Sequence, residues 1–102
     1  MLTHLMMLKF KDRFGGRSKI ENLTMTRDRI NNLLNIFPEL YKAKVYTDPQ
    51  VTPGNFDMLI VSKHPNRSKL KVFLNQAENF AEKEKIVDLI SDRVQLSYEN
   101  IN

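Results

Sequence analysis

The sequence contains no cysteine and no tryptophan, and only three of its 102 residues are glycine. Without cysteine, the chain has neither a disulfide framework nor a thiolate metal site, which fits a reducing cytoplasm. No apolar run approaches the roughly 20 residues of a membrane helix, and the opening residues lack the basic start of a signal peptide. We therefore expect a soluble cytoplasmic protein without a metal or another cofactor.

The remaining composition is that of an ordinary globular protein, with 41% hydrophobic and 27% charged residues. A length of 102 residues predicts one domain spanning residues 1–102. A chain of this size buries only about two thirds of the surface that its unfolded form exposes. Such a domain is marginally stable alone, so self-association would stabilise it.

The net charge of +4 comes partly from two local groups of cations. The groups are Arg13, Arg17 and Lys19, and Lys63, Arg67, Lys69 and Lys71. Such groups contact phosphates in nucleic-acid-binding proteins, but no regular aromatic pattern is interleaved here to stack on bases. An exposed loop and an exposed helix face explain them better, and we do not expect a nucleic-acid partner.

Alternation of apolar and polar residues predicts four strands, and a helical period predicts two helices. The expected strands span residues 2–11, 41–47, 56–63 and 94–99, and the expected helices span residues 19–36 and 66–89. Pro38 ends the first helix, whereas Asn66 caps the second, which re-forms from Phe80 to Leu89. Residues 12–18, with Gly15-Gly16 at their centre, are expected to form a loop.

The order of these elements is strand, helix, strand, strand, helix, strand. It predicts an α+β fold, the ferredoxin-like split βαβ, with a four-stranded antiparallel sheet and helices on one face. The strands nevertheless carry large apolar side chains on the uncovered face as well. Those side chains are Leu5, Met7, Leu59 and Val61. Monomers seldom expose such a patch, and burying each side chain is worth roughly 1.5–3 kcal/mol, so we expect a homodimer with its sheets packed face to face.

Four motifs occur in order along nearly the whole chain. They are His4 to Asp12, Ile36-Phe37-Pro38, Phe56 to Ser62, and Asp92-Arg93-Val94 through Tyr98. In these motifs the sequence resembles the stress-responsive A/B-barrel (Dabb) family of dimeric α+β barrels. The resemblance implies a dimer that joins two sheets, and a cavity between each sheet and its own helices.

In family members that act as polyketide cyclases, a first-strand histidine works with a tyrosine and a second histidine of the second helix. His4 occupies the first-strand position, whereas Phe73 and Asn79 replace the tyrosine and the second histidine. Neither a phenyl ring nor an amide titrates near neutral pH, so this pair cannot perform acid–base catalysis. Glu78 is adjacent to Asn79, but one helix step turns it about 100° away. The resemblance therefore leaves only His4 as a candidate catalytic residue and argues against an enzyme.

The face that carries His4 is expected to line the cavity and to contact a ligand. The expected ligand contacts are Met6, Leu8, Ile30, Met58, Ile60, Phe73, Gln76 and Asn79. His4 itself is interpreted either as a base, proton donor or ligand contact, or as a hydrogen-bonded core histidine. His64 precedes Pro65 and is expected to have a turn or surface role. A solvated helix face is expected for Glu78, Glu82, Glu84 and Asp88, which are mixed with lysines.

Three functions remain open. The favoured one is binding of a small apolar or aromatic molecule in the cavity, because the catalytic partners of His4 are missing. The alternatives are a cyclase or lyase that uses His4, and a structural, oligomer-forming stress protein without a ligand. Monooxygenases and haem-degrading proteins share this barrel fold, but the chain has no tryptophan and no evident axial histidine, so they rank below the others.

Overall fold

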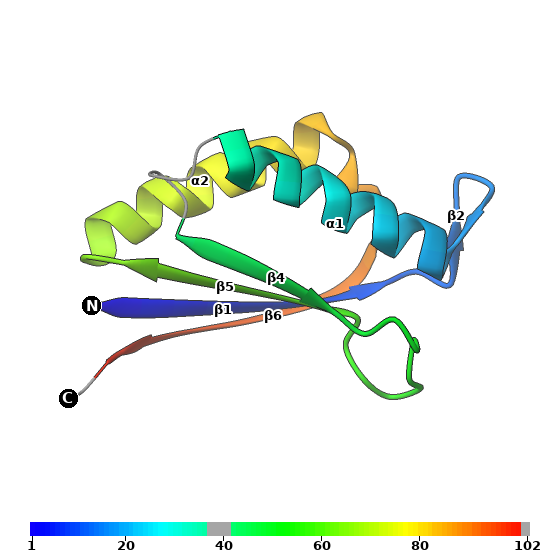
Figure 1. Ribbon diagram of the computed structural model, residues 1–102, viewed down its shortest axis with the longest axis horizontal. Helices are drawn as coiled ribbons and strands as arrows, with labels where there is room; N and C mark the ends of the chain where they lie inside the picture. Colours follow the sequence, from blue (N-terminus) through cyan, green and yellow to red (C-terminus); the bar gives the residue numbers. More distant parts are fainter. Residues whose placement is uncertain (37–41, 101–102) are drawn as a thin grey trace.

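The computed structural model describes residues 1–36 and 42–100, which form a sheet and a layer of helices on one of its faces (Figure 1). The elements are β1 (Leu2–Phe10), β2 (Arg13–Phe14), β3 (Arg17–Ser18), α1 (Lys19–Ile36), β4 (Ala43–Thr47), β5 (Met58–His64), α2 (Arg67–Lys83), the 3-10 helix η1 (Ile86–Leu89) and β6 (Ile90–Glu99). The main sheet is antiparallel, with the order β4-β5-β1-β6. This arrangement is the ferredoxin-like split βαβ, so the predicted fold class is confirmed.

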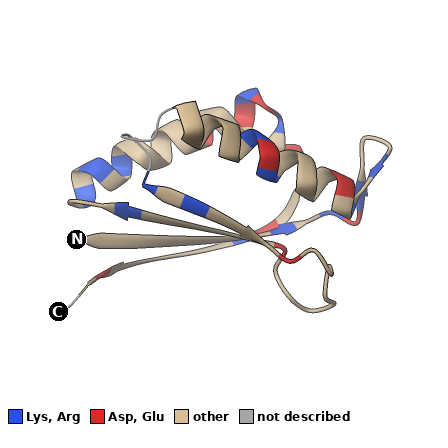
Figure 2. Cartoon of the chain, in the orientation of Figure 1, with Lys and Arg blue, Asp and Glu red and all other residues tan. Residues whose placement is uncertain are grey.

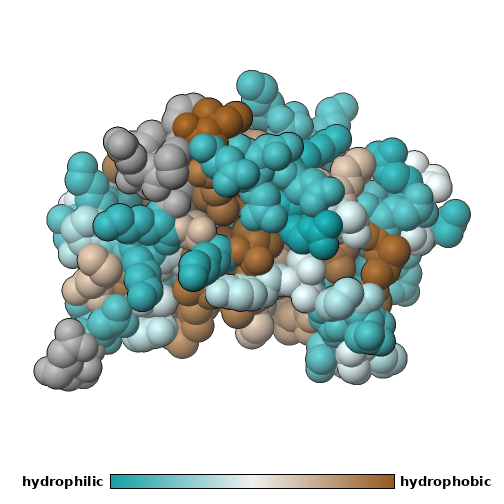
Figure 3. Space-filling view, in the orientation of Figure 1, coloured by the Kyte–Doolittle hydropathy of each residue, from teal (hydrophilic) through white to brown (hydrophobic). Residues whose placement is uncertain are grey.

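The hydrophobic core lies between the helices and the face of the sheet that they cover, which we call the inner face. Five buried side chains form its centre, and they are Leu8, Phe10, Leu23, Met58 and Leu89. In Figure 3, hydrophobic residues are visible between the helical layer and the sheet, and hydrophilic residues cover most of the visible outer side of the helices. The alternation along β1 and β5 therefore directs one set of side chains into the core, as expected from a half-buried strand.

Residues 12–18 contain a short β-hairpin, so the prediction of a loop is wrong. Gly15 and Gly16 have φ angles of 63° and 77°, and two consecutive positive φ angles are typical of the type I′ turn that closes two-residue hairpins. Asn22 of α1 is fully buried and its side-chain amide donates to the carbonyl oxygen of Phe14 at 3.2 Å. This bond ties the hairpin to the first helix.

The second helix begins as predicted, because the Asn66 side chain accepts a hydrogen bond from the Lys69 backbone N–H at 3.0 Å. Its predicted continuation to Leu89 is wrong. Lys85 has a φ of 58°, which ends the α-helix, and the chain continues as the 3-10 helix η1. As a result β6 begins at Ile90 and is longer than the predicted strand.

The first helix spans residues 19–36, as predicted. Pro38, expected to end it, lies outside the described residues, and so does Tyr41, the expected start of the second strand. β5 begins at Met58, two residues later than expected. Asp57 therefore precedes the strand and is buried, instead of facing outward with Leu59 as the strand prediction required.

The face of the sheet turned away from the helices, here called the open sheet face, is apolar along three strands. Its apolar side chains include Leu5, Met7, Leu59, Val61, Val94 and Leu96, which lie beside one another in the register of β5, β1 and β6. Met7 is 39% exposed and Leu96 is 59% exposed. No described helix covers this face (Figure 1). Among the described helices, none is both long and apolar enough to cross a lipid bilayer.

Candidate functional site

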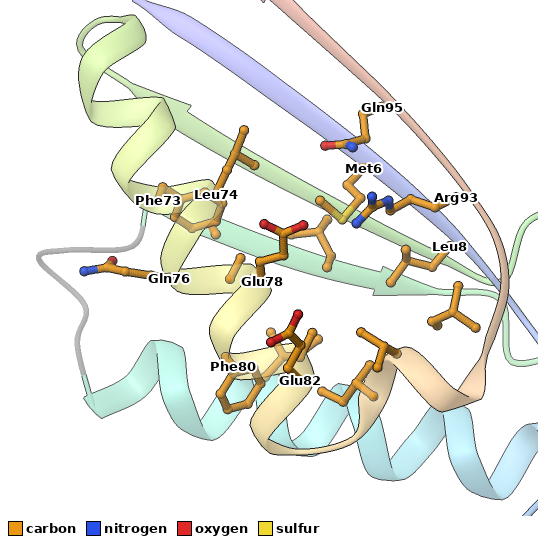
Figure 4. A pocket seen from close by; sticks show the side chains of 18 of the residues that line it. Met6, Leu8, Phe73, Leu74, Gln76, Glu78, Phe80, Glu82, Arg93 and Gln95 are labelled. Carbon is orange, nitrogen blue, oxygen red and sulfur yellow. The ribbon is translucent and has the colours of Figure 1, made fainter.

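A cavity of about 770 Å³ lies between the inner face of the sheet and the helices (Figure 4). Met6 and Leu8 of β1 and Ile60 of β5 line it from the sheet, and Ile30 of α1 and Phe80 of α2 line it from the helices. These apolar side chains point inward because strands alternate with a period of two and helices with a period of 3.6. A space of this size falls within the range of small-molecule sites.

Most of the expected ligand contacts line this cavity. Those that do are Met6, Leu8, Ile30, Ile60, Phe73 and Gln76. Met58 does not, because it is 2% exposed and packs in the core cluster. Asn79 does not line the cavity either and is solvent-exposed. Glu78, expected to point elsewhere, also lines the cavity.

His4 reaches the cavity from β1, and both of its ring nitrogens have partners. Its Nε2 lies 3.0 Å from Oε1 of Gln95, and its Nδ1 lies 2.6 Å from the hydroxyl of Ser97. With Gln95 Oε1 as the acceptor, Nε2 carries the proton and Nδ1 accepts the serine O–H. Burial lowers the pKa of His4, and the bond to Gln95 opposes part of that shift. His4 is therefore a neutral, oriented imidazole at the cavity wall.

His64 is buried on the inner face, so the expected turn or surface role is wrong. Its Nε2 lies 2.8 Å from the hydroxyl of Ser62, and its ring centroid lies 4.7 Å from that of Phe73. Ser62 is the strand partner of His4, which brings the two histidines to neighbouring positions. Burial lowers the pKa of His64, and a positive charge on His4 would lower it further.

The cavity reaches solvent between α2 and β6. Glu78 and Glu82 of α2 and Arg93 and Gln95 of β6 all line it and are all solvent-exposed. Figure 4 shows the two carboxylates and the guanidinium directed toward the same space. The predicted solvated helix face is confirmed for Glu78, Glu82 and Asp88, whereas Glu84 is half-buried. Glu78 and Glu82 also form the cavity mouth.

The described residues contain no group of three or more histidine, aspartate or glutamate side chains that could hold a metal ion. The cyclase arrangement of the resembling family is also incomplete, because Phe73 lines the cavity and carries no hydroxyl. The site can orient a polar group beside His4 and enclose an apolar body. General acid–base chemistry would require His4 to exchange one of its two present partners.

No protein-family model and no curated protein matches the sequence. Several solved structures are similar in fold. A dimeric ferredoxin-like protein of unknown function from Bacteroides fragilis NCTC 9343 has a TM-score of 0.74 and 18% identity, covering 97% of this chain and 95% of that chain. A DABB-family protein with a ferredoxin-like fold from Mesorhizobium loti has a TM-score of 0.64 and 7% identity, with coverages of 99% and 97%.

An antibiotic biosynthesis monooxygenase has a TM-score of 0.66 and 14% identity, and the similarity covers 100% of both chains. Identities this low establish a fold and do not establish a ligand or a reaction. The fold implied by the sequence resemblance is confirmed, and the chain has the ferredoxin-like α+β fold seen in the DABB-family protein and the monooxygenase.

Proposed function

We propose that the protein is a homodimer in which each chain binds a small apolar or aromatic molecule between its sheet and its helices. The observation that carries this proposal is the cavity of about 770 Å³ with a largely apolar interior. Binding sites for small molecules are typically apolar spaces of about 300–1,000 Å³ with a few placed polar groups. Gln95 supplies such a group, since His4 holds its Oε1 at 3.0 Å and leaves its NH₂ group to donate toward a ligand in the cavity that it lines.

The open sheet face supports the dimer. Leu96 and Met7 remain exposed in the single chain, and apolar patches of this kind usually bind a partner surface. The similar Bacteroides fragilis protein is described as dimeric. A second copy packed on this face would leave the cavity accessible, because the cavity lies on the opposite side of the sheet.

Catalysis of the cyclase or lyase type has less support. Phe73 and Phe80 of α2 cannot transfer a proton, and the carboxylates of α2 that line the cavity, Glu78 and Glu82, lie at its solvent-exposed mouth. Both nitrogens of His4 are already hydrogen-bonded. A role in binding requires no rearrangement of these bonds.

The test is binding of the neutral fluorophore 1-N-phenylnaphthylamine, which brightens in apolar surroundings. We expect saturable binding to the wild-type protein and loss of binding in Ala77→Phe, because Ala77 lines the cavity and a phenyl ring there would occupy it. The matched control is Val72→Phe, a change on α2 at a residue that is 52% exposed and does not line the cavity. Equal binding by both variants, or no binding by the wild-type protein, would contradict the proposal.

A further inference from the structure

The two walls of the cavity mouth differ in charge. Along α2 the charge changes sign, from Lys69 and Lys71 near its start to Glu78 and Glu82 in its later turns (Figure 2). The residues of α2 that line the cavity lie between Phe73 and Glu82, so Lys69 and Lys71 are not among them. On the opposite wall, β6 contributes the guanidinium of Arg93 and also Asp92. A molecule that enters between α2 and β6 therefore passes between carboxylates and a cation.

The two carboxylates have no cation of their own. Glu78 and Glu82 are four residues apart, so they are neighbours on the helix surface and repel each other. Within α2, the positions three and four residues from either of them contain no lysine or arginine, and Lys85, three residues after Glu82, follows the end of the helix. Among the described residues, neither side chain forms an ion pair. A ligand cation at the mouth would relieve this repulsion.

The β6 wall offers hydrogen-bond donors. Arg93 and Gln95 are two residues apart on one strand, so their side chains lie on the same face. His4 engages the Oε1 of Gln95 at 3.0 Å, which leaves the NH₂ group of Gln95 to donate toward a ligand. The neighbouring Asp92 accepts a hydrogen bond from the Arg93 backbone N–H at 2.8 Å. The guanidinium and this amide together suit a carboxylate.

We propose that the ligand is an apolar molecule with a zwitterionic head. Its ammonium group would lie against Glu78 and Glu82, its carboxylate against Arg93 and Gln95, and its apolar body against Met6 and Leu8. This inference rests on the proposed function of ligand binding. A plain carboxylic acid would place its charge opposite two carboxylates, and a plain amine would place its charge opposite Arg93. Only a head group with both charges can form favourable contacts with the α2 carboxylates and with Arg93 at the same time.

The experiment compares four ten-carbon probes that displace 1-N-phenylnaphthylamine at neutral pH. The probes are 2-aminodecanoic acid, decanoic acid, decylamine and decan-1-ol, each below the concentration at which it forms micelles. We expect 2-aminodecanoic acid to bind about tenfold more tightly than decan-1-ol, since charge-assisted hydrogen bonds each contribute appreciably. The two singly charged probes should bind more weakly than 2-aminodecanoic acid, because each of them meets one wall of like charge.

Two variants test the contributions of the β6 wall and the α2 wall separately. Arg93→Gln should weaken binding of 2-aminodecanoic acid and decanoic acid several-fold and leave decan-1-ol unchanged. The double variant Glu78→Gln/Glu82→Gln should weaken 2-aminodecanoic acid and decylamine and again spare decan-1-ol. The control is Lys71→Gln, which removes a charge from α2 at an exposed residue that does not line the cavity.

The outcomes distinguish this inference from the proposed function. Equal affinity for all four probes would overturn the zwitterionic head and leave apolar binding intact. Preference for 2-aminodecanoic acid that survives both variants would overturn the assignment to these walls. If neither the fluorophore nor any probe binds, the proposed function itself fails.

Discussion

Two histidines lie on the inner face of the sheet, and a serine hydroxyl is hydrogen-bonded to each. His4 contacts Ser97 at 2.6 Å, and His64 contacts Ser62 at 2.8 Å. Both imidazoles are buried, and burial lowers the pKa of each. The folded protein therefore favours their neutral forms.

This burial makes stability depend on pH. In the unfolded chain both imidazoles regain the ordinary histidine pKa of about 6.5, so below that pH the unfolded chain binds more protons than the folded protein. The free energy of unfolding is then fully retained above about pH 6.5 and decreases as the pH falls through the lower, folded pKa values. Urea unfolding followed at several pH values between about 7.5 and 5 should show this decrease.

The variant His64→Gln tests the origin of the effect. Its amide can still contact Ser62 but does not titrate, so the decrease in stability over this pH range should become smaller. An unchanged pH dependence in this variant would show that His64 is not responsible. The control is Asn66→Gln, a nearby polar change that removes the helix cap without removing a titrating group.

Only one of these two histidines could be recognised as an inner-face residue from the sequence. His4 is recognisable because it interrupts an apolar alternation in the first strand. His64 is not, since a histidine before a proline is typical of a turn, and its burial depends on Phe73 from a helix that comes later in the chain. That contact cannot be predicted from the residue type of His64 or from its neighbours along the chain.

At the scale of elements, one carboxylate joins two strands and a helix. Oδ2 of Asp57 accepts a hydrogen bond from the Phe10 backbone N–H at 2.8 Å and lies 3.3 Å from Nζ of Lys19. The Asp57 backbone N–H donates to the carbonyl oxygen of Leu8 at 2.9 Å. The end of β1, the start of α1 and the start of β5 thus meet at a side chain that is 1% exposed.

Removal of this carboxylate should destabilise the fold strongly. Asp57→Ala leaves the Phe10 N–H without its acceptor and leaves Lys19 with only the exposed Asp12, at 3.6 Å, as an ion-pair partner. An unsatisfied buried donor alone costs about 1–3 kcal/mol, and loss of the ion pair adds to this. Denaturant unfolding measures the loss. The control is Asp28→Ala, which breaks an exposed pair with Arg27 and should cost less than about 1 kcal/mol. Similar losses in the two variants would contradict this assignment.

Element boundaries are predictable from sequence where local patterns decide them. The first helix and the Asn66 cap follow from a helical period and a capping residue, both of which act within a few positions. The hairpin at Gly15-Gly16 and the break at Lys85 do not follow so directly. Gly-Gly favours a two-residue turn, but the hairpin strands have two residues each and are too short to show an alternating pattern. The break places a non-glycine residue at a φ of 58°, which local propensity disfavours.

At the scale of the whole molecule, the sheet separates two surfaces with different properties. The inner face borders the cavity, and the open sheet face carries apolar side chains that no described helix covers. The expected patch of Leu5, Met7, Leu59 and Val61 lies on one continuous face with residues of β6. The cavity mouth could not be predicted, because it joins α2 to β6 through space.

The proposed dimer predicts a specific response to charge. Leu96→Lys should shift the protein from dimer to monomer, because it places a cation on the open sheet face. The fold should tolerate the change, since Leu96 is 59% exposed in the single chain. Sedimentation equilibrium over a range of concentrations measures the shift. Val72→Lys on the exposed side of α2 is the matched control and should remain dimeric. A wild-type protein that sediments as a monomer throughout would refute the dimer.

The alternation of β1 has an evolutionary consequence. His4 and Met6 point toward the cavity, whereas their sequence neighbours Leu5 and Met7 point toward the open sheet face. Substitutions one position apart therefore act on different properties of the molecule. In the proposed dimer, ligand preference and self-recognition can therefore diverge separately among descendants of this chain, although a single stretch of a few residues would encode both.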